Sequence, residues 1–284
     1  MRLILPSTID IRLTSDCNKK CEFCFGTTIS SERTVQNWEQ ILSKFKSAGV
    51  KNIVITGGEP ATISKLAELV VIAHEKGFTV CLSTNGTVAF RDDIDIVLAN
   101  IDWLSLPLEG ETFFTHRLLR QSSLSEYHNI FALIRYAKEK FNTGIKIGTV
   151  VSKLNINSIE GIPLQIYQFA DTWKLYQVYL AGKRDEIIGK YSISLSEYYA
   201  VYNKCKSLCA KYPHLKCVSY DAETMNGKYL FCEPNANAMT IVQNREFSFG
   251  NFIDDFGYVC ENWNQYVEHD TLKENYQSTY GRNR

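Results

Sequence analysis

Three cysteines within a short segment are the residues of this sequence best suited to chemistry. In TSDCNKKCEFC, Cys17, Cys21 and Cys24 have the spacing C-x3-C-x2-C. Three thiolates on one loop can hold three irons of a cubane 4Fe–4S cluster and leave the fourth iron open, whereas four cysteines close the cluster for electron transfer. An open iron is what a chelating substrate requires. The spacing therefore predicts a cluster with one open coordination position.

A structural zinc site is the alternative interpretation of these cysteines. Zinc would need a fourth Cys or His within reach, in tetrahedral geometry. No histidine lies nearby in the sequence, and the cysteines follow an expected strand rather than a knuckle turn. The cluster is the favoured interpretation, and a zinc-dependent binding module stays as an alternative.

The six other cysteines are Cys81, Cys205, Cys209, Cys217, Cys232 and Cys260. An odd total of nine without an export signal argues against a disulfide framework. Cys205 and Cys209 are one helical turn apart, beside tyrosines, which is typical of a core face. We expect buried thiols here rather than an auxiliary cluster.

Composition excludes several classes of partner. Lys plus Arg and Asp plus Glu are 31 each, so no overall field favours nucleic acid or an anionic membrane. The first residues lack the apolar core and cleavage site of a signal peptide. No stretch approaches the roughly 18 apolar residues needed to span a bilayer. We expect a cytoplasmic protein.

Short β-rich runs alternate with helix-period segments along most of the chain. The expected strands are residues 9–13, 52–56, 78–84, 102–108, 144–151 and 173–180. Such repeated βα units predict an α/β fold with a parallel sheet, here a partial (β/α)6 barrel of the TIM type. From about residue 215 short strands and turns follow. We therefore expect a barrel core over 1–212 and a β-rich, substrate-covering extension over 213–284.

Candidate site residues lie where the strands end, the usual place of chemistry in parallel folds. The cysteines follow the first strand, GGEP (57–60) the second, STNG (83–86) the third and Glu109 the fourth. Alternation places Lys146 on the lumenal face of the fifth strand, and Ser105 and Glu109 on one face of the fourth. A lumenal Lys146 requires an anionic ligand or a carboxylate, for which Glu109 is the candidate.

Two motifs together resemble the signature of the radical S-adenosylmethionine (radical SAM) superfamily. They are C-x3-C-x2-C with Phe23 before its last cysteine, and the strand end GGEP. The resemblance covers roughly residues 8–182. It implies a 4Fe–4S cluster on the three cysteines, with S-adenosylmethionine bound to the open iron.

The resemblance also implies which residues bind S-adenosylmethionine. Gly57, Gly58 and Glu59 are expected to hold the methionyl amino group, since glycines allow close backbone approach and a carboxylate pairs with an ammonium. The residues expected at other parts of this cofactor are Ser83, Asn85, Ser105 and Arg120. Simpler interpretations are an ordinary tight turn for GGEP, a turn pair for Asn85 and its following glycine, and a surface charge for Arg120.

The implied activity is reductive cleavage of S-adenosylmethionine to a 5′-deoxyadenosyl radical, which removes a hydrogen atom from a substrate. No reductase motif is visible, so the resemblance implies a flavodoxin or ferredoxin as electron donor. A non-catalytic iron–sulfur sensor or scaffold is the other alternative, and it would not need the GGEP, Ser/Asn and Arg residues.

The second half of the chain bears on the substrate. KIGTVVSKLN and TWKLYQVYLAG resemble viperin-like and related molybdenum-cofactor-synthase-like enzymes. This resemblance implies a 3′-deoxy-3′,4′-didehydro nucleotide synthase. Lys146 and Lys153 would then contact the phosphates of the nucleotide substrate. Phe25-Gly26-Thr27 and LSLPLEG depart from the viperin pattern, and the C-terminal strands resemble peptide-acting radical enzymes. A small molecule, a nucleotide or a peptide therefore stays open as substrate.

Overall fold

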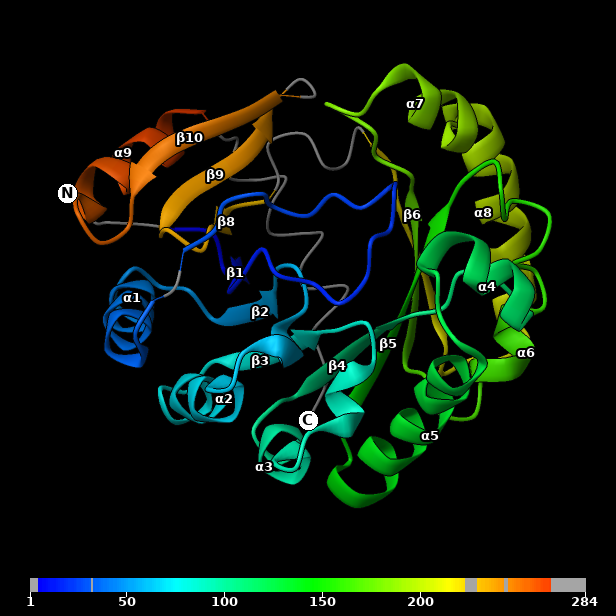
Figure 1. Ribbon diagram of the computed structural model, residues 1–284, viewed down its shortest axis with the longest axis horizontal. Coiled ribbons are helices and arrows are strands. Elements are labelled where there is room, and N and C mark those ends of the chain that lie inside the picture. Colours follow the sequence, from blue (N-terminus) through cyan, green and yellow to red (C-terminus); the bar gives the residue numbers. More distant parts are fainter. Residues whose placement is uncertain (1–4, 32, 223–228, 243–244, 267–284) are drawn as a thin grey trace.

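One sheet runs through the computed structural model, which describes residues 5–31, 33–222, 229–242 and 245–266 (Figure 1). Its strand order is β10-β9-β8-β1-β2-β3-β4-β5-β6-β7. The strand bounds are β1 Thr8–Arg12, β2 Asn52–Thr56, β3 Thr79–Ser83, β4 Trp103–Pro107, β5 Gly144–Val151, β6 Thr172–Gln177, β7 Lys216–Tyr220, β8 Phe231–Cys232, β9 Asn237–Val242 and β10 Arg245–Asn251.

The strands from β1 to β7 are parallel to their neighbours, and the sheet curves without closing. The expected α/β partial barrel is confirmed. The structure adds a seventh parallel strand, β7, which lies beyond residue 212. The strand β8 pairs with the other edge of β1, and β9 and β10 continue from it in antiparallel fashion. Strands of the C-terminal part thus extend both edges of the barrel sheet, and the division at 212 stays a prediction.

Helices cover the outer face of the curved sheet (Figure 1). Their bounds are α1 Val35–Ser47, α2 Leu66–Glu75, α3 Ile94–Ala99, α4 Phe113–Arg120, α5 Leu124–Phe141, α6 Ile162–Ile166, α7 Asp185–Tyr191, α8 Leu195–Cys209 and α9 Phe256–Tyr266, with short 3-10 helices at Pro60–Thr62 and Thr87–Phe90. Capping boxes begin α5 at Ser123 and α8 at Ser194, where a Glu three residues later satisfies the free backbone N–H group.

Alternation along the strands separates an apolar outer layer from a polar lumen. On β5, Ile145 and Ile147 are fully buried in the main core, whereas Lys146 belongs to the opposite face. On β1, Ile9 and Ile11 belong to the same core, and Asp10 and Arg12 face inward. The lumen therefore holds charged side chains from strands on both sides.

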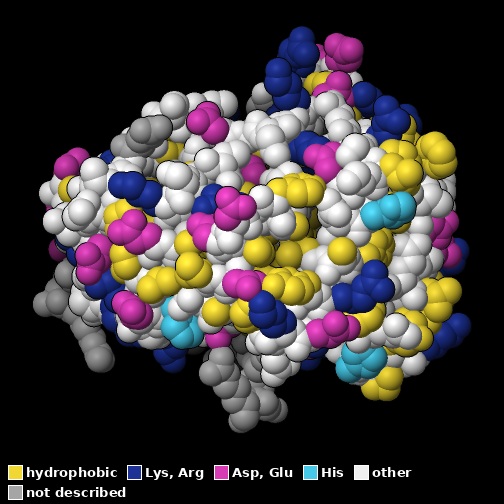
Figure 2. Space-filling model, turned by 60° about the horizontal axis from the view of Figure 1, so that its bottom comes forward, with side chains coloured by type: hydrophobic (Ala, Val, Ile, Leu, Met, Phe, Trp, Pro, Cys, Tyr) yellow, Lys and Arg dark blue, Asp and Glu magenta, His cyan; other side chains and the backbone are white. Residues whose placement is uncertain are grey.

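The surface carries charges of both signs, as expected from the equal numbers of acidic and basic residues. Acidic and basic side chains are interspersed on the face shown in Figure 2, which also carries apolar side chains near its centre. Within the described ranges, no helix is both long and apolar enough to cross a bilayer.

Candidate functional site

The three motif cysteines lie on the loop that follows β1. Cys17 and Cys24 are exposed and Cys21 is half-buried. A turn brings the last two together, since the Cys24 N–H donates to the Cys21 carbonyl over 3.1 Å. Gly26 lies beside the Cys24 thiol, where a Cβ would be in ordinary van der Waals contact at 3.5 Å from Sγ.

The GGEP segment after β2 holds the beginning of this loop. The Gly58 N–H donates to the Thr14 carbonyl over 2.7 Å, and the Glu59 N–H donates to the Asp16 carbonyl over 2.8 Å. A Cβ at Gly58 would lie 2.2 Å from the Asp16 carbonyl oxygen, and Gly57 has a φ of +134°. Gly58 must be glycine because its backbone touches that of Asp16. Gly57 must be glycine because its φ is one that residues with a side chain rarely adopt.

Further contacts fix the rest of the loop. Lys19 Nζ pairs with Glu126 of α5 at 2.5 Å, and Lys190 Nζ of α7 pairs with Glu22 at 2.6 Å. Phe23 is buried, with its ring centroid 5.8 Å from that of Tyr191. The cysteine loop is thus shaped by the folded chain itself.

The thiols fit a cubane better than a single metal ion. In the part of the chain that the structure describes, no three His, Cys, Asp or Glu side chains are placed to hold one ion. Tetrahedral zinc requires its thiolates about 2.3 Å from one point, whereas the thiolates of an open cubane each bind a different iron. Burial raises the pKa of the Cys17 and Cys21 thiols, so binding iron displaces their protons.

Glu59 connects the ends of two neighbouring strands. Its carboxylate accepts hydrogen bonds from the Thr84 hydroxyl at 2.6 Å, from the Asn85 backbone N–H at 2.6 Å and from the Ala61 N–H at 3.0 Å. The side chain is 1% exposed. Burial raises the pKa of its carboxyl group, although the three hydrogen bonds act to lower it. The carboxylate predicted to meet S-adenosylmethionine therefore also shapes the segment after β3.

The predicted polar residues of β3 and β4 lie around the same loop. The Asn85 side-chain amide donates to the Asn18 side-chain oxygen over 2.7 Å, which joins it to the cysteine loop. Ser83, Ser105 and Lys146 occupy registered positions on three adjacent strands. The structure thus brings these three lumenal residues together on one line across the sheet.

Arg120 and Glu109 form a pair beside the cysteine loop. Arg120 Nε and Nη2 lie 2.7 and 2.6 Å from Glu109 Oε1, and the Val150 N–H donates to Oε2 over 2.7 Å. Glu109 is fully buried, which raises its pKa against the opposing effect of Arg120. The carboxylate that was the candidate partner of Lys146 is paired with Arg120.

Two lysines and an aspartate interact in the lumen. Asp10 has electrostatic contacts with Lys146 and Lys174, and burial raises its pKa to about 6. Lys174 Nζ lies 3.2 Å from the Tyr229 hydroxyl and 3.7 Å from the centroid of the Tyr220 ring. Burial together with Lys146 lowers the pKa of Lys174 well below its usual value.

A second buried pair joins β1 to the segment after β8. Arg12 Nη1 lies 2.7 Å from Glu233 Oε1, and both side chains are 5% exposed or less. The guanidinium lies against the rings of Phe231 and Phe25, at 4.1 and 4.9 Å from their centroids. Glu233 Oε2 and Asp10 Oδ1 are buried without a hydrogen-bond partner among the described residues.

Two sets of predicted residues lie away from this lumen. Lys153 is exposed beyond the end of β5, and its N–H donates to the Tyr191 carbonyl. Cys205 and Cys209 are buried on α8, where the second thiol hydrogen-bonds with that of Cys217 on β7. The described cysteines are free thiols.

Sequence reasoning missed Asp10, Lys174 and Thr84. The alternation rule that placed Lys146 in the lumen would also have placed Asp10 between Ile9 and Ile11, and Lys174 between Trp173 and Leu175. Thr84 has no such signal, because its role depends on a contact with Glu59, 25 residues away in the chain.

Comparison with known proteins agrees with this geometry. The family model described as the radical SAM superfamily matches residues 11–162. An S-adenosylmethionine-dependent nucleotide dehydratase of Flammeovirga pacifica is 25% identical over 217 residues, 71% of this chain and 72% of that protein. The sporulation killing factor maturation protein SkfB of Bacillus subtilis is 31% identical over 107 residues, 37% of this chain and 26% of that protein.

A solved structure shares the fold. The crystal structure of Streptococcus suis SuiB bound to S-adenosylmethionine gives a TM-score of 0.75 at 17% identity, covering 95% of this chain and 68% of that one. The family match itself spans more than half of the present sequence and includes the cysteine loop and the GGEP segment. The chain therefore belongs to the radical SAM superfamily.

Proposed function

We propose that this radical SAM enzyme acts on an anionic small molecule, of the nucleotide class, bound in the lumen of the partial barrel. Membership of the superfamily makes the protein an enzyme that uses a 4Fe–4S cluster and S-adenosylmethionine. When bound, these groups supply the 5′-deoxyadenosyl radical that removes a substrate hydrogen atom. The residues of this chain provide the binding, the orientation and the exclusion of water.

Cys17, Cys21 and Cys24 would hold the cluster, and the GGEP segment would border S-adenosylmethionine. The close backbone contact between Gly58 and Asp16 supports this proposal, because it sets the cysteine loop directly beside that segment. Ser83, Asn85 and Ser105 lie at or just beyond β3 and β4, next to this region. The Arg120 guanidinium lies over the Phe23 ring, 5.3 Å from its centroid.

The observation that carries the substrate proposal is the pair of lumenal lysines. Lys146 and Lys174 are 3% and 5% exposed, and they interact with one carboxylate, that of Asp10. Burial together with Lys146 lowers the pKa of Lys174, and a substrate phosphate beside these two lysines would stabilise their charged forms. The rings of Tyr176, Tyr220 and Tyr229 line the same region, and Lys174 Nζ lies over those of Tyr176 and Tyr220, at 4.8 and 3.7 Å from their centroids.

A peptide substrate is the second candidate, and the unpartnered carboxylate oxygens favour it. Glu233 Oε2 and Asp10 Oδ1 could accept hydrogen bonds from amide or amine N–H groups. A structure similar to this chain, with a TM-score of 0.74, is that of SuiB bound to its precursor peptide SuiA.

The enzyme requires a source of single electrons, for which we propose an external flavodoxin or ferredoxin. We also propose a cytoplasmic location, because a reducing compartment keeps free thiols such as those described here from forming disulfides.

Anaerobic turnover tests the proposed function. The reconstituted enzyme is given S-adenosylmethionine and dithionite, and 5′-deoxyadenosine is measured with nucleoside triphosphates or with peptides added in turn. We expect nucleotides to stimulate its formation. Stimulation by peptides alone would favour the second candidate, and an iron-free protein that forms no 5′-deoxyadenosine would contradict the activity itself.

Two lysine variants test whether the nucleotide that stimulates 5′-deoxyadenosine formation binds in the lumen. Lys174→Met removes the charge but keeps the length of the side chain, and it should raise the nucleotide KM by about 10-fold or more, the loss expected for a charged hydrogen bond. Iron content and affinity for S-adenosylmethionine should stay unchanged. Lys216→Met, at an exposed position of β7, is the matched control.

A further inference from the structure

One face of α4 exposes large apolar side chains. Phe114 is 76% exposed and Leu118 is 58% exposed, and Arg117 is exposed between them. Residues three and four apart share a helix face, so these three side chains form one surface. The opposite face, with His116 and Leu119, is buried. Aromatic residues and arginine are the types that protein interfaces favour.

This surface lies next to a cluster ligand. The Cys21 Sγ is 4.0 Å from the carbonyl oxygen of Arg120, the last residue of α4. The next residue, Gln121, donates from its side-chain amide to the Lys20 carbonyl over 3.2 Å. The end of α4 therefore packs against the cysteine loop, and a protein docked on α4 would be close to the predicted cluster.

The surface also has unbalanced positive charge. Arg117 and Lys20 are exposed and have no ion-pair partner within the ranges that the structure describes. The neighbouring cations differ in this respect, because Lys19 pairs with Glu126 and Arg120 pairs with Glu109. An apolar centre with free cations at its rim is complementary to an acidic protein.

We propose that the α4 surface, formed by Phe114, Arg117, Leu118 and Lys20, is the docking site for a small acidic one-electron carrier protein of the flavodoxin or ferredoxin class. The proposal rests on the proposed function, which requires such a carrier. One electron passes from the reduced carrier to the cluster, so the carrier is oxidised by one electron and the cluster is reduced by one. No atom is transferred.

Turnover with two reductants tests this surface. Dithionite needs no docking site, whereas flavodoxin, kept reduced by its reductase and NADPH, does. Arg117→Glu and Leu118→Ser should each raise the KM for flavodoxin by about 10-fold, as expected for residues central to an interface. Dithionite-driven turnover should equal that of the wild type, because both side chains are exposed and lie outside the lumen. Added salt should weaken the wild type more than Arg117→Glu.

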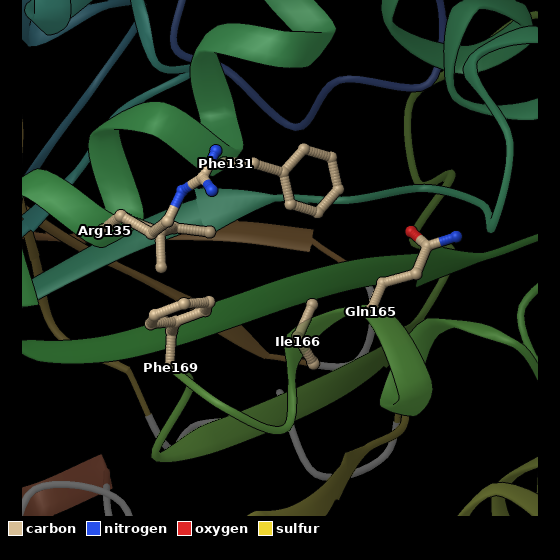
Figure 3. A pocket seen from close by; sticks show the side chains of 6 residues that line it. Phe131, Arg135, Gln165, Ile166 and Phe169 are labelled. Carbon is tan, nitrogen blue, oxygen red and sulfur yellow. The ribbon is translucent and has the colours of Figure 1, made fainter.

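A second exposed apolar surface provides the matched control. Phe131 and Arg135 of α5, with Gln165 and Ile166 of α6 and Phe169, line a groove of about 260 Å³ (Figure 3). Leu164, 67% exposed, is on the same helix α6. Arg135→Glu and Leu164→Ser repeat the two chemical changes on this second surface. Arg135 lies more than two helical turns along α5 from Glu126, which contacts the cysteine loop. Both should leave the flavodoxin KM unchanged.

Binding separates this proposal from the proposed function. Calorimetry with oxidised flavodoxin measures docking without turnover, and Arg117→Glu should weaken binding by about 10-fold. Unchanged binding and unchanged KM in the α4 variants, or equal losses in the groove variants, would overturn the docking site. A wild-type enzyme that binds flavodoxin at α4 but forms no 5′-deoxyadenosine with dithionite would instead contradict the proposed function.

Discussion

At the scale of single residues, Glu59 has two possible effects on S-adenosylmethionine, and they can be separated. Glu59→Gln removes a charged acceptor, and Thr84→Val removes one of its donors without touching the carboxylate. We expect Glu59→Gln to keep the cluster and to weaken S-adenosylmethionine binding by about 10-fold, the effect of losing a charge-assisted hydrogen bond.

Calorimetry on both variants distinguishes the two effects. If Thr84→Val weakens binding as much as Glu59→Gln, Glu59 acts by holding the segment after β3. If only Glu59→Gln weakens it, the carboxylate contacts the cofactor directly. Unchanged affinity in both would remove Glu59 from the site.

Asp10 makes stability depend on pH in an unusual direction. Its pKa is about 6 in the folded chain, above the ordinary value of 3.8, so the folded state binds its proton more tightly. The resulting stabilisation is complete at low pH and is lost as pH rises through 6. The free energy of unfolding should therefore fall by about 1 kcal/mol more between pH 5 and 7 in the wild type than in Asp10→Asn. Urea unfolding at both pH values measures this, and parallel profiles would contradict it.

Residue types alone predicted part of the site. Cys17, Cys21, Cys24 and Glu59 could be named as candidates because few kinds of protein site share their spacing. Arg12 and Glu233 could not, because they are 221 residues apart and meet only when β8 pairs with β1. The pairing of Glu109 with Arg120 could not be predicted for a related reason. Strand alternation predicts on which face of the sheet a side chain lies, but it does not predict which helix packs against that side chain. Here the helix is α4, which contributes Arg120.

At the scale of elements, the contact between the GGEP segment and the cysteine loop can be broken without changing a cysteine. Gly58→Ala would place a Cβ 2.2 Å from the Asp16 carbonyl oxygen, so the two backbones must separate. We expect iron content after reconstitution to fall to less than half of the wild-type value. Iron and sulfide analysis measures this effect.

Gly189→Ala is the control for that substitution. This glycine lies within α7, and a Cβ there would meet nothing within 4 Å. Alanine should favour the helix by up to about 1 kcal/mol and leave iron content unchanged. Full iron content in Gly58→Ala would show that the close contact is not needed for cluster binding.

The strands of the barrel were largely predictable, and the exception is instructive. The six expected strands all exist, and each boundary lies within three residues of its expected position. The seventh, β7, begins at an exposed Lys216 and continues with half-buried residues, as an edge strand does. It lacks the apolar run of the inner strands, so hydrophobic pattern alone could not assign it to the parallel sheet.

At the scale of the whole molecule, the Arg12–Glu233 pair ties the C-terminal strands to the beginning of the barrel. Removing one partner leaves a buried charge, so Glu233→Leu should reduce the free energy of unfolding by about 3–5 kcal/mol. The double variant Arg12→Met/Glu233→Leu should recover much of that loss, because it buries apolar groups instead. Denaturant unfolding of the three proteins measures both effects. A single variant as stable as the wild type would show that the pair contributes nothing to this connection.

Because protein contacts hold the cysteine loop, we expect metal binding and folding to be separate events in this protein. In a zinc finger the free energy of metal binding is also the free energy of folding, so the metal-free protein is lost. Here ion pairs at Lys19 and Glu22 and the backbone contact at Gly58 hold the loop through protein interactions. Oxygen that destroys the cluster should therefore leave a folded apoprotein, which can be reloaded with iron and sulfide. Oxidative damage at this site is then a matter of repair rather than of new synthesis.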